Sequence, residues 1–259
     1  MLPVLTSLQN PRVKRIVRLR NRRERDREGV FVVEGEREVG RALAAGLEVE
    51  EAYVLPDRLT GDLPFADRPQ EVSPEVMAKM SYRDPPTGVL GVFRTPRRTL
   101  DDLAVPPRAI FLVAVNTQKP GNLGAMARTA AAAGCAGVIA AEADVDVFNP
   151  NAIRNSTGAI FSTPVVAADA DAVRRWLAAS KIHSVATVTA GGEDLWTGEW
   201  DTPGAVAILI GPEHEGLDAG WTDFANGHLS IPTSGEGVDS LNASNAAAVV
   251  LFEVIRRRA

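Results

Sequence analysis

The feature that most constrains the fold of this chain is the regular alternation, from residue 109 onward, of short apolar runs with helix-forming segments. Ala109–Val115, Gly137–Ala141 and Ala205–Ile210 are almost continuously apolar, which is typical of strands buried on both faces of a sheet. The alanine-rich Leu123–Ala133 ends at Gly134, as helices often do. Further strands are predicted at Pro164–Val166, His183–Thr189 and His228–Ile231, and further helices at Ala152–Asn155, Ala170–Ala179, Ala219–Ala225 and Leu241–Arg257. This alternation predicts an α/β domain with a mostly parallel sheet.

The first hundred residues show a looser mixture of short elements. The pattern predicts strands at Val30–Val33, Ala52–Leu55 and Val89–Phe93, and helices at 10–27, Glu36–Ala45 and Pro74–Met80, the last capped by Ser73. Residues 95–107 contain three prolines, which is typical of a linker. We therefore predict two domains, residues 1–100 and 106–259, of which the first is a small α/β unit.

Composition excludes several classes of protein. With 259 residues, 45% of them hydrophobic and 24% charged, the chain has the make-up of a globular protein. Its single cysteine cannot form an internal disulfide or supply a cysteine-based metal site. The first residues lack the apolar core of a signal peptide, and no apolar run reaches the ~18 residues needed to span a bilayer. We expect a soluble, cytoplasmic protein.

Charge is distributed unevenly along the chain. The formal net charge is −5, but residues 1–27 carry nine basic groups against two acidic ones, which leaves −12 for the remainder. Arginine suits phosphate because its planar guanidinium donates two parallel hydrogen bonds. The alternative is a solvated helix face with paired charges, for which two acids are too few. This segment therefore favours nucleic-acid binding through Arg12, Lys14, Arg15, Arg18 and Arg22.

The common signatures of other enzymes are missing. The sequence has no GxxxxGK[ST] phosphate loop, no GxGxxG after a strand and no GxSxG nucleophile elbow, which argues against P-loop enzymes, ordinary dehydrogenases and hydrolases of that type. His183, His214 and His228 lack the spacing of metal ligands. We expect no metal site.

Three polar loops follow predicted strands. In the first, residues 116–129, Pro120 and Gly121 would make a turn and Asn122 would cap the next helix, but this leaves Arg128 among alanines unexplained. In the second, Asn149 would start and Gly158 would stop a short helix, beside which Arg154 and Ser156 could hold a phosphate.

The third loop is composite. It contains Glu213 and Glu215 after one strand, Ile231 after another, and a stretch before the last helix in which Asp239 or Ser240 would be the cap. Taken singly, each residue has an ordinary structural explanation. Together the three loops lie at the carboxyl ends of strands, where open α/β sheets bind their ligands.

In these loops the chain resembles the SpoU (TrmH-type) family of RNA ribose 2′-O-methyltransferases, within the knotted SPOUT superfamily. The matching motifs are NLGAMART, NPNAIRNSTGAIF, IGPEHEGL and IPTSGEGVDSLNASNAA, in the family's order across most of residues 110–255. The start, SLQNPRVKRI followed by RERDREGVFVVEG, is similar to the N-terminal substrate-binding domain of many members, which itself resembles small ribosomal RNA-binding proteins.

The resemblance implies a fold and an assembly. The expected catalytic domain is a mostly parallel sheet whose C-terminal segment passes through an earlier loop as a deep trefoil knot. The expected protein is a homodimer, with part of the last helix at the interface. S-adenosylmethionine would bind in the knot, mainly to backbone around Thr189, Gly211, Ile231 and Leu241.

The resemblance also implies roles for individual residues. Arg128 would act at the ribose 2′-hydroxyl; since arginine is always protonated, we expect it to grip phosphate and orient the hydroxyl, with substrate phosphate or water accepting the proton. Glu213 would orient Arg128 or its partner loop. Asn122 and Asn242 would position ribose and backbone, Ser240 would fix the knot loop, and Arg154 would meet RNA phosphate, from the neighbouring subunit or its own.

Several alternatives remain at this stage. The substrate expected from relatives with this layout is large-subunit ribosomal RNA, but transfer RNA fits the same motifs. A protein that binds RNA without methylating it, and a methyltransferase acting on a base, are also open. A hydrolase unrelated to RNA is disfavoured because no nucleophile–base pair is visible.

Overall fold

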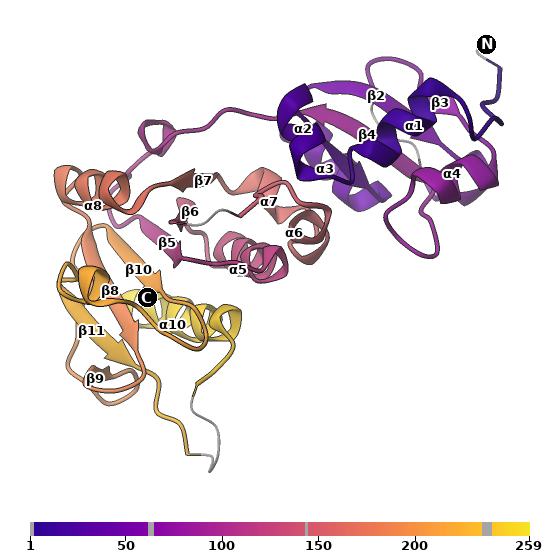
Figure 1. Ribbon diagram of the computed structural model, residues 1–259. Coiled ribbons are helices and arrows are strands. Elements are labelled where there is room, and N and C mark those ends of the chain that lie inside the picture. The colour runs from indigo at the N-terminus through magenta and orange to yellow at the C-terminus, as the bar shows by residue number, and fades with distance from the viewer. Residues whose placement is uncertain (1–2, 62–64, 143–144, 235–239) are drawn as a thin grey trace. The chain divides into compact units, whose positions relative to one another are not determined.

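The computed structural model describes residues 3–61, 65–142, 145–234 and 240–259. The chain packs as two compact units (Figure 1). Unit 1 comprises Met1–Arg97 and Phe148–Ser162, and unit 2 comprises Arg98–Val147 and Thr163–Ala259. Asp239, a predicted cap, lies outside the described residues, as does the middle of the predicted knot loop. The predicted division at residues 1–100 and 106–259 stays a prediction.

Unit 2 is built on a seven-stranded sheet in which every pairing is parallel, in the order β7-β6-β5-β10-β8-β11-β9. The predicted α/β class with a mostly parallel sheet is therefore confirmed. The strands are β5 (Ile110–Val115), β6 (Gly137–Ala141), β7 (Val165–Ala168), β8 (His183–Val188), β9 (Glu193–Asp194), β10 (Val206–Ile210) and β11 (Gly227–Ser230).

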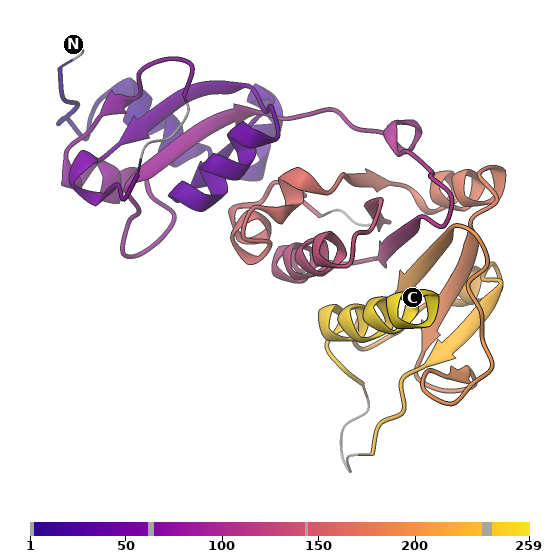
Figure 2. The ribbon, with the colours of Figure 1, turned by 180° about the vertical axis from the view of Figure 1, so that it is seen from behind.

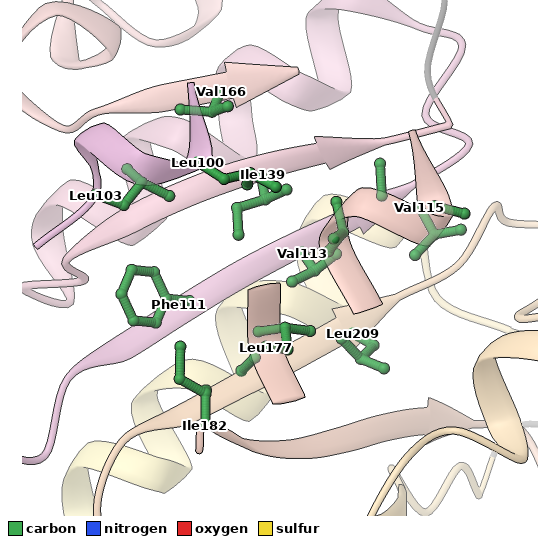
Figure 3. Close-up of a cluster of buried hydrophobic side chains, with 14 of the residues drawn as sticks. Leu100, Leu103, Phe111, Val113, Val115, Ile139, Val166, Leu177, Ile182 and Leu209 are labelled. Carbon is green, nitrogen blue, oxygen red and sulfur yellow. The ribbon is translucent and has the colours of Figure 1, made fainter. Parts of the chain in front are cut away.

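Helices cover this sheet on both faces. They are α5 (Pro120–Ala132), α8 (Ala170–Ala179), α9 (Ala219–Thr222) and α10 (Ala243–Arg258). Helices α5 and α10 contact each other and the central strands (Figure 2). On the other face, Phe111 and Val113 of β5 pack with Leu177 of α8 in a fully buried cluster (Figure 3). Continuous apolar strands follow from this double cover, because every side chain of β5 and β10 is buried.

Unit 1 contains a mixed four-stranded sheet in the order β1-β4-β2-β3. Its strands are β1 (Val30–Glu34), β2 (Val49–Val54), β3 (Gln70–Glu71) and β4 (Val89–Arg94), and its helices are α1 (Pro11–Arg18), α2 (Arg22–Glu28), α3 (Glu36–Ala44), α4 (Pro74–Met80), α6 (Pro150–Asn155) and α7 (Ala159–Ser162). Val13 and Ile16 of α1 pack with Met77 of α4 against one face of this sheet.

The segment Phe148–Ser162 comes from the middle of the chain, between β6 and β7, and packs in unit 1. Phe148 stacks on Phe31 of β1 with ring centroids 4.5 Å apart, and Phe161 lies 5.9 Å from the same ring. Arg41 of α3 donates to the Thr157 carbonyl at 2.8 Å. All five residues of β1 are buried, since this segment and α1 cover opposite sides of the strand.

Some sequence expectations are wrong in detail. The predicted basic helix over 10–27 is two helices, because the Asn21 side chain accepts from the Arg23 amide and starts a second one. The last helix begins at Ala243 and is capped by Asn242, not by Asp239 or Ser240. The predicted cap Asn122 lies inside α5, which starts two residues earlier at Pro120. By contrast, Ser73 and Asn149 cap α4 and α6 as predicted.

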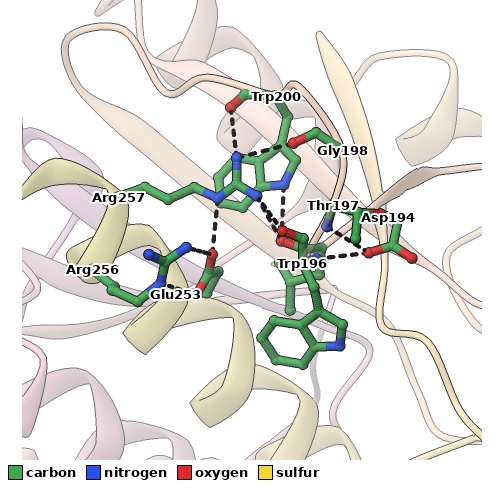
Figure 4. Close-up of polar contacts among 9 residues, drawn as sticks. Asp194, Trp196, Thr197, Gly198, Trp200, Glu253, Arg256 and Arg257 are labelled. Atoms are coloured by element: carbon green, nitrogen blue, oxygen red, sulfur yellow. Dashed lines mark hydrogen bonds and ion pairs between the residues drawn. The ribbon is translucent and has the colours of Figure 1, made fainter.

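The C-terminal end of α10 is tied to the loop that follows β9 (Figure 4). The Arg257 guanidinium lies 4.1 Å from the centre of the Trp200 ring and pairs with Glu253, itself 6% exposed. It also donates to the backbone carbonyls of Leu195, Trp196 and Gly198 at 3.0–3.1 Å. These contacts hold the last helix against the sheet of unit 2. Within the described ranges, no helix has the length and apolar character needed to cross a membrane.

Candidate active site

Three adjacent strands of unit 2 end at the residues predicted to contact a cofactor. Thr189 directly follows β8, Gly211 follows β10 and Ile231 follows β11. Strand β8 lies between β10 and β11, and all three are parallel, so the three residues lie at one edge of the sheet. This is the edge at which open α/β sheets bind ligands.

Glu213 is the centre of a polar cluster at the carboxyl end of β10. Its carboxylate accepts from Asn122 Nδ2 at 2.8 Å, from Lys119 Nζ at 3.2 Å and from Asn242 Nδ2. Ser240 Oγ donates to the Glu213 carbonyl oxygen at 3.0 Å. We call Lys119, Asn122, Glu213, Ser240 and Asn242 the Glu213 cluster. It joins the start of α5, the loop after β10 and the start of α10, and it contains four of the five predicted catalytic residues.

Local helix structure orients the two asparagines. Asn242 caps α10, and its Oδ1 accepts from the Ser244 amide at 3.0 Å, which leaves its Nδ2 to face Glu213. Because α5 begins at Pro120, Asn122 has no capping bond to make, and its Nδ2 is available to the carboxylate. Asn122 can therefore bind Glu213 because it is not the helix cap that the sequence predicted.

These donors keep Glu213 ionised. The hydrogen bond from Asn122 and, after it, the Lys119 ammonium hold the pKa of the Glu213 carboxyl below its usual range. The carboxylate therefore stays charged at neutral pH and is occupied by three donors. Its hydrogen bonds from Asn122 and Asn242 join the starts of α5 and α10.

A pocket of about 220 Å³ opens beside the cluster. It is lined by Asn116, Thr117, Gln118, Lys119, Asn122, Pro212, Glu213, His214, Glu215 and Ala243. Gly211 sets its shape, because a Cβ there would lie 2.5 Å from the backbone of Gly216 and Leu217. The loop after β10 can fold back over its own start only if residue 211 is glycine. Leu241, the remaining predicted cofactor contact, is half-buried before α10.

Arg128 lies six residues beyond Asn122 on α5 and is exposed. It makes no ion pair or side-chain hydrogen bond with any residue in the described ranges, and Glu213 pairs with Lys119 instead. Glu213 therefore does not contact Arg128 within these ranges, and the expectation that it orients Arg128 or its partner loop stays a prediction. An exposed guanidinium without a protein partner is available to a phosphate.

Lys119 belongs to this site although no sequence motif pointed to it. The available signal was its position directly before Pro120, at the start of a helix that follows a strand. Its ammonium is 69% exposed and contacts Glu213 from the solvent side. Across the part of the chain that the structure describes, no group of three or more His, Cys, Asp or Glu side chains is placed to hold a metal ion.

The residues predicted to contact RNA differ in their surroundings. Arg12, Lys14 and Arg18 are exposed on α1, and Arg22 is exposed with a 3.4 Å contact to Asp26. Arg15 instead pairs with three carboxylates, those of Glu28, Glu50 and Glu51. The expectation that basic side chains here lack acidic partners is wrong for Arg15, because its partners come from β2 as well as from α2.

The two predicted contacts on the middle motif also differ. Arg154 is exposed on α6. Ser156 is fully buried, and its Oγ donates to the Ile153 carbonyl at 2.8 Å and accepts from the Gly158 amide at 3.2 Å. Ser156 therefore stabilises the turn after α6, and only Arg154 is accessible to a phosphate.

The part of the sequence that forms the polar cluster and the strand ends matches a known family. Residues 109–252 match the SpoU rRNA Methylase family, which is more than half of the chain. The protein belongs to the SpoU rRNA methylase family. Residues 10–91 match the MRM3-like substrate binding domain, so the SpoU match is confined to the later part of the chain.

Several relatives are similar to this chain over almost its whole length. A crystallised RNA 2′-O ribose methyltransferase is 41% identical, with a TM-score of 0.85 over 99% of both chains. The SpoU methyltransferase AviRb from Streptomyces viridochromogenes, crystallised in complex with AdoMet, is 30% identical, with a TM-score of 0.86 over 96% of this chain and 98% of that chain. The Bacillus subtilis (strain 168) 23S rRNA (guanosine(2553)-2′-O)-methyltransferase RlmP is 28% identical over 96% of this chain and 98% of its own.

We expect Glu213→Ala to lower kcat/KM for methyl transfer by roughly 100-fold. Alanine removes the Oε1 atom that accepts from both Asn122 and Asn242, so the two side-chain amides lose the group that orients them. Steady-state methyl transfer to rRNA measures this. The matched variant is Lys119→Met, which removes only an exposed contact at 3.2 Å and should cost less than about fivefold. Equal losses in both variants would show that charge, and not the orientation of the asparagines, is what Glu213 provides.

Proposed function

We propose that this protein transfers a methyl group from S-adenosylmethionine to a ribose 2′-hydroxyl of 23S ribosomal RNA. The observation that carries the proposal is the Glu213 cluster at the carboxyl edge of the parallel sheet, which gathers Asn122, Ser240 and Asn242 around one carboxylate. Its support is membership of the SpoU family together with relatives that methylate ribose 2′-hydroxyls of RNA.

The residues present fit the proposed cofactor. Thr189, Gly211 and Ile231 follow adjacent strands, so their backbone groups can bind a polar ligand, and half-buried Ile231 and Leu241 offer apolar surface to a purine. AviRb was crystallised with AdoMet, and we assign the same cofactor here. When bound, it supplies the electrophilic methyl group.

Chemistry then requires the protein to position the nucleophile and dispose of its proton. Arg128 holds a phosphate of the target nucleotide and orients the ribose hydroxyl toward the methyl group. Its guanidinium is always protonated, so substrate phosphate or water takes the proton from the 2′-oxygen. Asn122 and Asn242 position ribose and backbone, in an arrangement anchored by Glu213.

The fold and assembly of the catalytic domain are part of the proposal. We infer a deep trefoil knot formed by the C-terminal segment, whose residues 235–239 lie outside the described part of the chain. We also infer a homodimer with part of α10 at the interface. Phe252 of α10 is 49% exposed, and such an apolar side chain on a helix surface is suited to a partner subunit.

Binding of RNA by α1 should depend steeply on salt. Replacing Arg12, Lys14 and Arg18 together by Gln should reduce the slope of log K against log salt by about 2, since roughly 0.7–0.9 is lost for each phosphate contact. Substitution is preferable to deletion, because Val13 and Ile16 of the same helix are buried. Filter binding of a 23S rRNA transcript measures the slopes. Coincident curves for wild type and variant would show that α1 does not contact the RNA.

The decisive experiment maps ribose methylation in cells with and without this gene. We expect one 2′-O-methylated position of 23S rRNA to disappear with the gene and to be restored by the purified protein and S-adenosylmethionine in vitro. If the methylation that disappears lies in transfer RNA, the substrate is transfer RNA and not 23S rRNA. A lost base methylation would overturn the proposed reaction, and the absence of any change in RNA would favour a protein that only binds it.

A further inference from the structure

A pocket of about 490 Å³ in unit 1 is lined by arginines from three separate segments. Arg37 lies in α3, Arg58 ends the 3₁₀ turn Pro56–Arg58, and Arg83 lies in the loop after α4. The remaining lining residues are Gly35, Glu36, Glu38, Pro86, Thr87 and Gly88. None of these three arginines belongs to the basic segment at the start of the chain.

A buried carboxylate holds two of these arginines. Glu38 is 2% exposed, and its Oε1 lies 2.9 Å from Arg37 Nη2 and 3.3 Å from Arg83 Nη2. Burial alone would raise the pKa of Glu38, but the hydrogen bond from Arg37 and the charge of Arg83 hold it below its usual range. Since each guanidinium has five N–H donors, both arginines keep donors for a ligand.

The third arginine and the remaining acid are also fixed. Arg58 Nη1 donates to the Pro86 carbonyl at 2.9 Å. The Glu36 carboxylate accepts from the amide and the hydroxyl of Thr60 at 2.7–3.2 Å. Each acid of the pocket therefore has its own donors. The three arginines against Glu36 and Glu38 give the lining a net charge of +1.

Two glycines keep the pocket in this form. Gly35 has φ +100°, and a Cβ there would lie 2.7 Å from Glu38 Oε2 and 3.4 Å from Arg83 Nη1. A Cβ on Gly88 would lie 2.6 Å from the Arg58 carbonyl oxygen. A side chain at residue 35 would thus displace the carboxylate that positions Arg37 and Arg83.

A fourth arginine is brought to the same region by α6. Arg154 lines a smaller pocket together with Arg83, Glu34 and Tyr82. Glu34 is 8% exposed and accepts from Ser81 Oγ at 2.7 Å and from the Tyr82 and Arg83 amides, so it fixes the loop that carries Arg83. Arg154 itself is exposed and forms no ion pair with a described residue.

We propose that Arg37, Arg58, Arg83 and Arg154 form a binding surface for the phosphate backbone of the RNA substrate, distinct from α1. Arginine forks match phosphate geometry, and the buried Glu38 fixes where those of Arg37 and Arg83 lie. The proposal rests on the proposed function for the identity of the ligand as RNA. Because the chain has a net charge of −5, RNA must bind to local surfaces that are positively charged.

The test compares binding of an unmodified 23S rRNA transcript by full-length variants over a salt series. Arg37→Gln/Arg58→Gln should raise the Kd at least about tenfold near 0.15 M salt and reduce the salt slope by about 1.5. Arg154→Gln should reduce the slope by a further 0.7–0.9, roughly one phosphate contact. Gly35→Ala should weaken binding too, although it removes no charge. The matched control is Arg97→Gln/Arg175→Gln, which removes two exposed arginines outside the surface.

Each outcome decides the proposal. Slopes and Kd values equal to those of the control would overturn it, provided that chemical unfolding shows each variant to be folded. If wild type binds and methylates the transcript while the double variant binds equally well, only this surface is wrong. If wild type does not bind the transcript, the proposed substrate and this surface fail together.

Discussion

Arg128→Ala is expected to lower the turnover of methyl transfer by about 1000-fold or more while leaving the fold intact. The guanidinium is the only group on the solvent side of α5 to which we assign the substrate phosphate, and loss of such positioning costs several kcal/mol in the transition state. Because Arg128 is exposed and has no partner within the described residues, the free energy of unfolding should change by less than about 0.5 kcal/mol. Single-turnover methylation of a verified rRNA substrate and urea unfolding provide the two measurements.

Arg128→Lys separates charge from geometry. Lysine keeps the positive charge but lacks the bidentate fork. We therefore expect Arg128→Lys to lower the turnover by roughly 10–100-fold, which is less than the loss in Arg128→Ala. Arg175→Ala is the matched control, since Arg175 is an exposed arginine on α8 of the same unit. Near-normal turnover of Arg128→Ala would contradict the role assigned to this residue.

The second large effect concerns stability. Arg257→Ala should lower the free energy of unfolding by roughly 2–4 kcal/mol. The change removes donors to Leu195, Trp196 and Gly198 and the stacking on Trp200. It also removes one of the two arginine donors to Glu253 Oε1, which keeps its bond from Arg256. Denaturant unfolding of unit 2, followed by tryptophan fluorescence, measures the loss.

The adjacent arginine supplies the control. Arg256 pairs with the same Glu253 at 2.6 Å but is 68% exposed, so Arg256→Ala should cost less than about 1 kcal/mol. The Arg256 and Arg257 side chains together lower the pKa of Glu253 to about 2. The stabilising contribution of Glu253 is therefore complete above its unfolded-state pKa and is lost as the pH falls toward 2. If both alanine variants were equally unstable, the carbonyl contacts of Arg257 would contribute nothing beyond charge.

The sheet of unit 2 could be predicted from sequence because its strands are buried on both faces. Continuous runs such as Phe111–Val115 have no other common explanation once helices lie between them. The two-residue strands Gln70–Glu71 and Glu193–Asp194 carry no periodicity and were not predicted. The break at Asn21 was also missed, because the apolar spacing of Val13 and Leu19 runs on toward it while the cap competes locally.

The sequence predicted which residues gather at the candidate site better than it predicted which of them pair with one another. Motifs selected Asn122, Glu213, Ser240 and Asn242, which the structure brings together. Sequence could not show that Glu213 pairs with Lys119, because the two residues lie 94 positions apart. The three acidic partners of Arg15 were hidden for the same reason, since two of them lie on a strand of a different segment.

The packing of Phe148–Ser162 in unit 1 bears on how far the two matched regions can be exchanged as modules. Residues 1–97 alone would leave Phe31 without its 4.5 Å stacking partner Phe148 and Arg41 without the Thr157 carbonyl to which it donates at 2.8 Å. A substrate-binding region transplanted from another member of the family would need to bring its own version of this segment, although the segment is encoded within the methylase region. The packing of the substrate-binding region thus depends on a short stretch some fifty residues downstream of the linker.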